Sequence, residues 1–299
     1  MPELPDILLY IHALRSRIVG HVLELVRLAS PFLLRSIDPP PAAVEGRTIV
    51  GLHRLGKRVV LEAEEELFLV FHLMIAGRFR WKACGTKIPG KVGLLALDFG
   101  NGTLLLTEAG SKRQASLYIV RGREALAQHE PGGAQVLDIT LPEFAGALQS
   151  ANHTLKRALT DPHVFSGIGN AYSDEILHAA RLSPFKQTQS LTDAEVRQLH
   201  EATLATLTTW IERLQQQAAG EFPEKVTAFH EEMAVHGKYG QPCPRCGSPV
   251  QRIVYAANEA NYCATCQTGG RLLADRSLSR LLREDWPKTV EELERKKRG

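Results

Sequence analysis

Hydrophobic spacing predicts a helix at the start of the chain. Apolar residues recur every three or four positions, which places them on one face of an α-helix. They are Ile7, Ile11, Leu14 and Ile18. Pro5 suits the first turn, where the backbone N–H has no partner to lose, and Gly20 ends the segment.

Residues 47–120 change to the spacing of strands. Short runs of apolar or alternating residues follow one another here, among them RTIVGLHRL, LFLVFHL and GLLALDF. Asn101-Gly102 separates two such runs and is typical of a tight hairpin turn. We therefore predict an antiparallel sandwich or barrel.

From about residue 125 to 235 the pattern is helical. Thr192 and Glu195 have the spacing of a capping box, and a long amphipathic helix is expected after them. Residues 216–225 read as a mobile loop. Further on, we expect a short helix around residues 278–282 and a solvated, frayed end at residues 295–298.

Composition narrows the class of protein but does not identify a partner. With 299 residues, 44% hydrophobic and 23% charged, the chain has the balance of a folded globular protein. No apolar run reaches the roughly 18 residues that cross a bilayer, and the N-terminus lacks the basic region of a signal peptide. The net charge of +3 is small, and residues 271–299 hold the whole excess.

Four of the five cysteines predict a metal site. They form two C-x-x-C pairs separated by sixteen residues, namely Cys243, Cys246, Cys263 and Cys266. Two such pairs supply the tetrahedral four-sulfur shell of a structural zinc ion. Because that shell leaves no open position, the metal is not expected to be catalytic. Cys84 stands alone and reads as an ordinary small side chain.

A glycine-containing turn is the second candidate site. Gly167, Gly169 and Asn170 separate two expected helices, which gives a helix–two-turn–helix arrangement. Glycines allow a phosphate to approach the backbone, and the positive end of the following helix favours an anion. Lys156, in the preceding helix, could add a charge. Taken alone, such a turn is as often structural as functional.

The N-terminus is the third candidate site. A small second residue permits removal of the initiator Met, which would leave Pro2 with a free secondary amine. An α-amino group has a pKa near ~8, and the positive end of a helix lowers it, so a neutral nucleophilic fraction is expected. Glu3 is adjacent and could move protons. On its own, this sequence is more often an ordinary chain start.

Together, the three motifs resemble those of the formamidopyrimidine-DNA glycosylase / endonuclease VIII family of base-excision repair enzymes. PELP, GIGNAYSDE and C-x2-C-x16-C-x2-C occur in this order, and the resemblance covers residues 2–267. It implies an α+β multidomain fold. The expected parts are a catalytic β-sandwich with an N-terminal helix (1–130), a helical domain (131–235), a zinc-finger β-hairpin (236–270) and a basic extension (271–299).

The resemblance also implies roles for individual residues. Pro2 matches the nucleophile that attacks C1′ of the damaged nucleotide, Glu3 the acid, and Lys57 the strand lysine that binds phosphate and assists catalysis. Lys156 and Asn170 match phosphate contacts. The reaction implied is bifunctional: the damaged base is flipped out and removed, and elimination from an iminium intermediate then cuts the backbone.

Four positions depart from the family pattern. Asp6 stands where the family usually has Glu. Asn258 stands where the zinc hairpin normally presents an arginine, for which Arg252 could substitute. Two loops that fill the space of the flipped base are also changed, which leaves Ile75 and Gln114 as candidate wedges. These differences bear on the preferred lesion rather than on the glycosylase chemistry.

We therefore expect a DNA glycosylase/AP lyase with one zinc ion, acting on duplex DNA that holds a damaged base or an abasic site. We expect a monomer with no membrane association, located in the cytoplasm, or at the nucleoid in a bacterium. A catalytically silent DNA-binding protein on the same scaffold is the alternative. A tautomerase with an N-terminal proline would leave the zinc site and glycine turn unexplained.

Overall fold

The computed structural model describes residues 1–110, 112–255, 258–274 and 287–298. The chain divides into two compact units. Unit 1 contains Met1–Gly132 and Thr209–Ala228, and unit 2 contains Gly133–Thr208 and Phe229–Gly299. In the described part of the chain, no helix is long and apolar enough to cross a membrane.

Unit 1 is built on a bent sheet of eight strands in the order β5-β7-β6-β1-β2-β3-β4-β8. The strands are β1 (Val22–Leu28), β2 (Arg47–Leu55), β3 (Arg58–Ala63), β4 (Leu67–His72), β5 (Gly77–Lys82), β6 (Gly93–Phe99), β7 (Gly102–Glu108) and β8 (Ser116–Arg121). All pairs are antiparallel, and β1 and β2 share only two paired positions. The sheet is thus two four-stranded halves, as the predicted sandwich requires.

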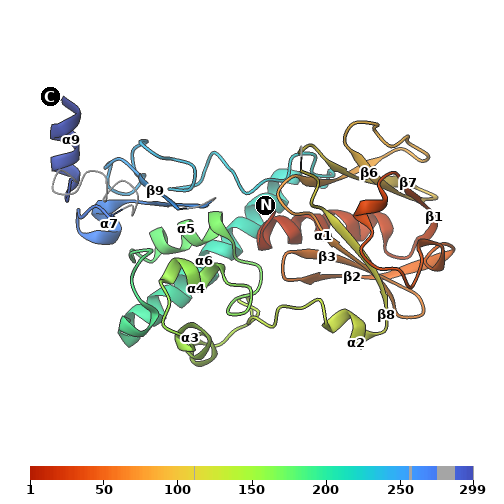
Figure 1. Cartoon of the computed structure of the whole chain (residues 1–299), viewed down its shortest axis with the longest axis horizontal. Helices are drawn as coiled ribbons and strands as arrows, with labels where there is room; N and C mark the ends of the chain where they lie inside the picture. Colours follow the sequence, from red (N-terminus) through yellow and green to blue (C-terminus); the bar gives the residue numbers. More distant parts are fainter. Residues whose placement is uncertain (111, 256–257, 275–286, 299) are drawn as a thin grey trace. The chain divides into compact units, whose positions relative to one another are not determined.

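The first helix, α1 (Leu4–Ile18), begins one residue before Pro5 and packs against β2 and β3 (Figure 1). Its four predicted core residues are all buried. Tyr10 on α1 meets Phe79 on β5 edge-to-face at 5.4 Å, and Phe79 meets Phe71 on β4 at 5.2 Å. These rings join the helix to both halves of the sheet.

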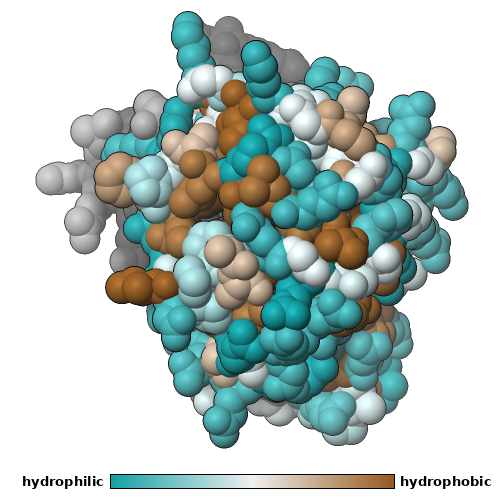
Figure 2. Space-filling view, turned by 90° about the vertical axis from the view of Figure 1, so that its right-hand side faces the viewer, coloured by the Kyte–Doolittle hydropathy of each residue, from teal (hydrophilic) through white to brown (hydrophobic). Residues whose placement is uncertain are grey.

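Short segments complete unit 1: η1 (Pro31–Leu33), η2 (Pro41–Ala43) and α2 (Arg123–Ala127). Leu126 on α2 packs with Val60, Phe68 and Val70 on the outer face of β3 and β4. The surface in Figure 2 is mainly hydrophilic, with apolar side chains set between polar ones. The buried apolar side chains of unit 1 lie inside the sandwich and beneath α2.

Two local expectations in unit 1 are present with shifted limits. The β6–β7 hairpin exists, but Phe99 pairs with Gly102, so the two loop residues are Gly100 and Asn101 rather than Asn101 and Gly102. Residues 219–225 form the predicted loop, with no helix or strand. The helix α6 (Asp193–Ala218) covers residues 216–218 of the predicted stretch, and the residues after it are attached to unit 1 by side-chain contacts.

Those contacts come from two side chains. Phe222 lies 6.0 Å from the ring of Tyr10 and beneath the guanidinium of Arg17. The carboxylate of Glu224 accepts from Arg80 Nη1 at 2.7 Å and from Lys82 Nζ at 2.6 Å. The loop is therefore attached to unit 1 by side-chain contacts, and its mobility stays a prediction.

Unit 2 contains the helices and the small hairpin. Its helices include α3 (Leu141–Gln149), α4 (Leu155–Thr160), α5 (Asn170–Ala179), η3 (Thr188–Ser190) and the first part of α6. The predicted capping box is present at the start of α6: the Thr192 N–H donates to the Glu195 carboxylate, and the Glu195 N–H donates to Thr192 Oγ1. The hairpin is β9 (Gln251–Tyr255) with β10 (Asn258–Tyr262), followed by α7 (Ala264–Thr268).

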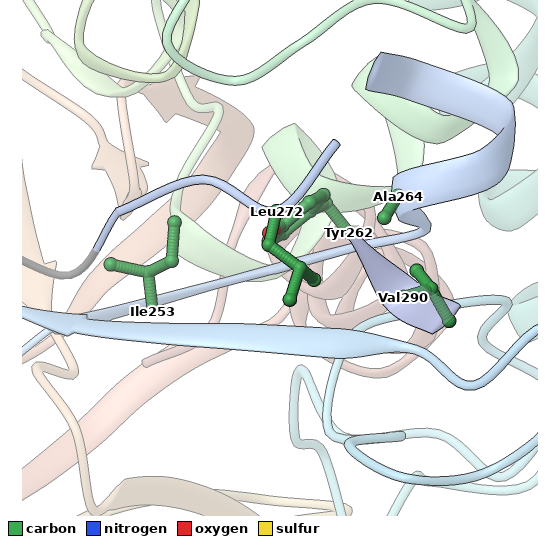
Figure 3. Packing of buried hydrophobic residues seen from close by; sticks show 5 residues of the cluster. All are labelled: Ile253, Tyr262, Ala264, Leu272 and Val290. Atoms are coloured by element: carbon green, nitrogen blue, oxygen red, sulfur yellow. The ribbon is translucent and has the colours of Figure 1, made fainter. Parts of the chain in front are cut away.

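The extension after the hairpin is folded onto it. Leu272 and Val290 join a buried cluster with Ile253, Tyr262 and Ala264 (Figure 3). The last helix, α9 (Val290–Arg298), takes in the residues expected to be frayed, and Leu293 packs on the same cluster. The frayed end was therefore a wrong expectation. The helix predicted around residues 278–282 lies outside the described residues.

Candidate active site and nucleic-acid-binding elements

Three connections of unit 1 lie at one end of its sheet. Arg58, His72 and Ser116 occupy paired positions on β3, β4 and β8, and Gly77 pairs with Glu108 on β7. The β2–β3 turn (56–57), the β4–β5 turn (73–76) and the β7–β8 loop (109–115) therefore converge. These connections hold three candidate residues of unit 1, namely Lys57, Ile75 and Gln114. Ser111, in the last connection, is outside the described residues.

Pro2 and Glu3 are buried at the N-terminus of α1. Glu3 is the N-cap residue, and its backbone N–H donates to Asp6 Oδ2 at 2.8 Å in a capping box. The shorter carboxylate of Asp6 therefore still reaches the start of the chain. Asp6, which stands where the family usually has Glu, therefore caps the first helix.

Burial lowers the pKa of the amine of Met1, the residue that precedes Pro2. The carboxylates of Glu3 and Asp6 oppose that shift, and the positive charges of Arg78 and Lys57 add to it. A lower pKa means a larger neutral fraction, which is the nucleophilic form. The carboxylates of Glu3 and Asp6 thus act on a terminal amine that burial has made less basic.

Lys57 lies in the β2–β3 turn, where Gly56 has a φ of +61°. Arg54 Nη1 donates to Gly56 O at 2.8 Å and so fixes the turn. The charge of Lys57 acts on the terminal amine and on His72. Its predicted role remains a proposal, but its turn belongs to the same end of the sheet as the N-terminal charges.

His72 was not among the candidates. Burial lowers its pKa to about 4, with further lowering by Arg58 and Lys57, so its imidazole is neutral at pH 7. It ends β4 directly before the turn that carries Ile75. The sequence feature that could have identified His72 is its place in HLMIAG, three residues before the candidate Ile75.

The two wedge candidates are presented by neighbouring connections. Ile75 is 65% exposed in the β4–β5 turn, and Gln114 is exposed in the β7–β8 loop. The buried carboxylate of Glu108 accepts the backbone N–H groups of Gln114 and Ala115 at 3.0 and 3.1 Å. Both side chains are thus displayed from fixed backbone, as a wedge would need.

In unit 2, the glycine turn joins α4 to α5. Gly167 has a φ of +95°, a conformation that favours glycine, and Gly169 is the N-cap of α5. The predicted helix–two-turn–helix arrangement is present, and Asn170 is the partly exposed residue at the start of its second helix.

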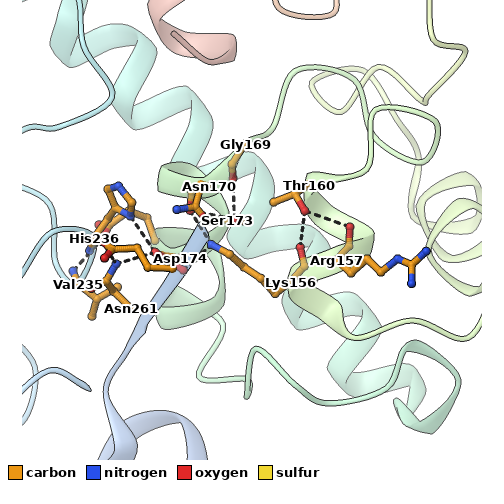
Figure 4. Close-up of polar contacts among 12 residues, drawn as sticks. Lys156, Arg157, Thr160, Gly169, Asn170, Ser173, Asp174, Val235, His236 and Asn261 are labelled. Atoms are coloured by element: carbon orange, nitrogen blue, oxygen red, sulfur yellow. Dashed lines mark hydrogen bonds and ion pairs between the residues drawn. The ribbon is translucent and has the colours of Figure 1, made fainter. Parts of the chain in front are cut away.

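Lys156 is not placed to bind a phosphate. Its side chain is 2% exposed, and Nζ donates to Asp174 Oδ1 at 2.5 Å and to Asn170 O at 2.6 Å (Figure 4). A phosphate would have to displace a buried carboxylate to reach this ammonium. The predicted DNA contact is therefore corrected: Lys156 supports the turn from inside.

Asp174 and Glu175 form a buried polar network that the motif analysis missed. The second oxygen of Asp174 accepts from Asn261 Nδ2 at 3.2 Å and lies 2.8 Å from His236 Nδ1 (Figure 4). The carboxylate of Glu175 accepts three backbone N–H groups, from residues 234–236. Burial raises the pKa of Glu175, which these donors oppose. The sequence feature that could have indicated this network is the pair of adjacent acidic residues, Asp174 and Glu175, within GIGNAYSDE.

The four predicted metal ligands come together. The sulfur atoms of Cys243, Cys246, Cys263 and Cys266 all lie within 4.8 Å of one another. A tetrahedron with zinc–sulfur bonds of about 2.3 Å has edges of about 3.8 Å, so the donor set fits this ion. His178 Nε2 lies 3.3 Å from Cys243 Sγ, where an N–H would support a thiolate.

The hairpin also holds the last two DNA-binding candidates. Arg252 is exposed on β9, with its guanidinium 4.7 Å from the ring centre of Tyr239 and 3.8 Å from Glu259 Oε2. Asn258 opens β10 and pairs with Tyr255, but its side chain is outside the described residues. Arg252 is thus an oriented cation on the hairpin.

Comparison with known protein families covers most of the chain. The formamidopyrimidine-DNA glycosylase N-terminal domain matches residues 1–110, and the H2TH domain of the same proteins matches residues 133–219. The zinc finger found in this glycosylase and in isoleucyl-tRNA synthetase matches residues 240–269. Each predicted domain type, though not its exact limits, has a counterpart in these matches.

Individual relatives agree. The formamidopyrimidine-DNA glycosylase of Thermus thermophilus is 32% identical over 279 residues, covering 90% of this chain and all of that protein. A formamidopyrimidine-DNA glycosylase-like protein of Mycobacterium tuberculosis is 42% identical over 152 residues, covering 50% of this chain and 94% of that protein.

Solved structures show the same fold. The Thermus thermophilus crystal structure superposes with a TM-score of 0.75 at 32% identity, covering 89% of this chain and 98% of that one. A Lactococcus lactis structure in complex with DNA containing Fapy-dG gives a TM-score of 0.79 at 24% identity, covering 89% of this chain and all of that one. The predicted fold and enzyme class are therefore confirmed, and the chain belongs to the formamidopyrimidine-DNA glycosylase family.

Proposed function

We propose that this protein is a bifunctional DNA glycosylase and AP lyase that removes oxidised bases from duplex DNA, with Pro2 as its nucleophile. The observation that carries the proposal is the buried chain start, where Pro2 and Glu3 are both buried at the head of α1 and the Glu3 N–H donates to Asp6 Oδ2 at 2.8 Å. A neutral amine at neutral pH is what attack on a sugar carbon requires.

The chemistry follows from a secondary amine. After removal of Met1, the Pro2 nitrogen attacks C1′, and the base leaves with the electrons of the glycosidic bond and a proton. Glu3 protonates the ring oxygen as the sugar opens, which leaves an iminium ion. Its positive charge acidifies the C2′ hydrogen, and loss of that proton expels the 3′ phosphate.

The remaining site residues are assigned to DNA and metal binding. Lys57, Asn170 and Arg252 contact phosphates, with Gly167 and Gly169 shaping the turn at Asn170. Ile75 or Gln114 fills the gap left by the flipped base. Asn258 would face DNA in place of an arginine. The four cysteines would hold one zinc ion, whose chemistry is structural: it keeps the two knuckles of the hairpin together.

The proposal extends to the organisation of the molecule. We assign residues 1–130 to the catalytic domain, 131–235 to the helical domain, 236–270 to the zinc finger and 271–299 to the extension. The protein acts as a monomer on DNA in the cytoplasm, or at the nucleoid in a bacterium. Lactococcus lactis relatives bound to abasic-site or Fapy-dG DNA support this choice of partner.

Borohydride reduction with abasic duplex DNA tests the mechanism. The processed protein should give a covalent adduct, because the reagent reduces an iminium to a stable amine. An N-terminally extended variant should give none, because its Pro2 nitrogen is an amide. Pro2→Gly keeps a primary amine and should retain partial trapping.

The outcomes separate the rival functions. Equal cross-linking by the extended variant would identify another amine as the nucleophile, with Lys57 tested first. Tight DNA binding without any adduct would favour the catalytically silent DNA-binding protein. Release of base from a panel of lesion duplexes would then identify the preferred damage.

A further inference from the structure

We propose that His178 on α5 is a further residue of the metal site: its imidazole donates a hydrogen bond to the sulfur of Cys243 and holds that sulfur as a thiolate. The inference rests on the zinc ion of the proposed function and goes beyond the four cysteines assigned to it. His178 Nε2 lies 3.3 Å from Cys243 Sγ, and both residues are buried. A metal-bound thiolate carries no hydrogen, so the imidazole is the donor in this contact.

The first knuckle, residues 243–246, contacts His178 at two points. Besides the sulfur contact, Arg245 Nη1 donates to the backbone O of His178 at 2.9 Å. His178 lies in the last turn of α5, where a cation also complements the partial negative charge of the helix end. The knuckle therefore holds the backbone of His178 through one residue and meets its ring through another.

The segment that covers the cysteines is also attached to α5. The carboxylate of Glu175 accepts the N–H groups of residues 234–236, and this segment packs on Cys243 and Cys263. The helix also packs against β10 and α7, the elements on either side of Cys263. Glu175 and His178 are three positions apart and so share one face of the helix. The metal site is thus built against this face of α5.

Cys243 needs a protein donor more than the other cysteine of its knuckle does. Four thiolates around one Zn²⁺ carry a net charge of about −2, and a buried charge is costly unless hydrogen bonds compensate it. Cys246 is exposed and can accept from water, whereas Cys243 is 2% exposed. A protein group must therefore supply the hydrogen bond to Cys243, and His178 is in place to do so.

The position of the ring hydrogen tests the contact without any substitution. Long-range ¹H–¹⁵N correlations in NMR spectra distinguish the two neutral tautomers of a histidine. In the zinc-loaded, full-length protein, His178 should carry its hydrogen on Nε2. A ring with hydrogen on Nδ1 alone would overturn the inference, because Nε2 would then have nothing to donate.

Zinc affinity is the second readout, measured by competition with a chelator. His178→Phe keeps a ring but removes the donor, and it should lower the affinity about tenfold, a typical loss when a hydrogen-bond partner of a metal ligand is removed. His178→Gln keeps a donor near the position of Nε2 and should recover part of the affinity. His200→Phe is the matched control, because it removes the contact of His200 Nε2 with Ile139 O at 3.0 Å, outside the cysteine cluster.

Cobalt substitution reports the sulfur itself. A hydrogen bond stabilises the electrons of a thiolate, so charge transfer from sulfur to Co²⁺ then needs more energy. In Co²⁺-loaded His178→Phe, this absorption band should lie at longer wavelength than in wild type, with His178→Gln between the two. The band of His200→Phe should match wild type, since loosened packing elsewhere does not change the sulfur.

Equal zinc affinity and an unshifted cobalt band in His178→Phe would overturn the inference and leave the zinc assignment intact. If His178→Phe does not fold, the tautomer of wild type and the cobalt band of His178→Gln decide. Folded wild-type protein that binds no zinc would instead refute the metal ion of the proposed function, and this inference with it.

Discussion

The ammonium of Lys156 and the carboxylate of Asp174 form an ion pair at 2.5 Å, with both side chains almost fully buried. The pair joins α4 to α5 directly beneath the glycine turn. Burial of two charges is costly, so the contact is tolerated because every charge has close partners. The pair therefore supports the turn from within, while Asn170 at the start of α5 stays partly exposed.

Replacing Lys156 with Met should destabilise unit 2 strongly. The change removes the cation and leaves Asp174 buried with only His236 and Asn261 as partners, which costs about 3–5 kcal/mol. Thermal denaturation would measure the loss. Lys186→Met, which breaks the half-exposed pair with Glu195, is the control and should cost at most about 1 kcal/mol. Equal losses would contradict the buried-pair account.

Lys57 should be visible in the salt dependence of DNA binding. If its ammonium contacts one phosphate, Lys57→Ala should make the log–log slope shallower by about 0.9. Arg121→Ala is the control because Arg121 ends β8 on the side opposite Ser116 and the site. Equal slopes for wild type and Lys57→Ala would remove this lysine from the phosphate contacts.

The four-cysteine cluster should carry one zinc ion per chain. Cys263→Ser should lose the metal and weaken DNA binding, since one of four close sulfur atoms is removed. Elemental analysis of the purified protein measures this directly. Cys84→Ser should keep full metal content because Cys84 is an exposed thiol outside the cluster. Folded wild-type protein without zinc would refute the assignment.

His72 should make the protein sensitive to acid. Its pKa is lowered to about 4, so the unfolded chain binds a proton between pH 6.5 and 4 that the folded chain does not. Stability should therefore fall as the pH is lowered through this window. NMR titration should give a pKa near 4 that rises in Arg58→Gln and is unchanged in Arg121→Gln. A value near 6.5 would show that His72 is not shielded from water.

The fold was predictable where local pattern and tertiary environment agree. Ile7, Ile11, Leu14 and Ile18 have helical spacing, and all four are buried in α1. The contacts of the segment after α6 were not predictable, because the partners of Glu224 are Arg80 and Lys82, about 140 positions away in the chain. No short sequence window contains that information.

Some residues of the candidate site could be predicted from the sequence and others could not. The cysteines were identifiable because metal chemistry fixes their type and spacing, and their sulfur atoms meet. Lys156 was misassigned because a lysine near a glycine turn looks the same in sequence whether its ammonium faces solvent or Asp174. His72 carries no motif of its own, and its lowered pKa comes from its burial and from Arg58 and Lys57 beside it.

The contacts of Glu175 have a consequence for amide hydrogen exchange. Residues 234–236 form no regular helix or strand, yet all three of their N–H groups donate to one buried carboxylate on α5. Their hydrogens should exchange as slowly as those of α5 itself, because each must wait for the carboxylate to move away. An irregular segment would thus report the opening of a helix about sixty residues earlier in the chain.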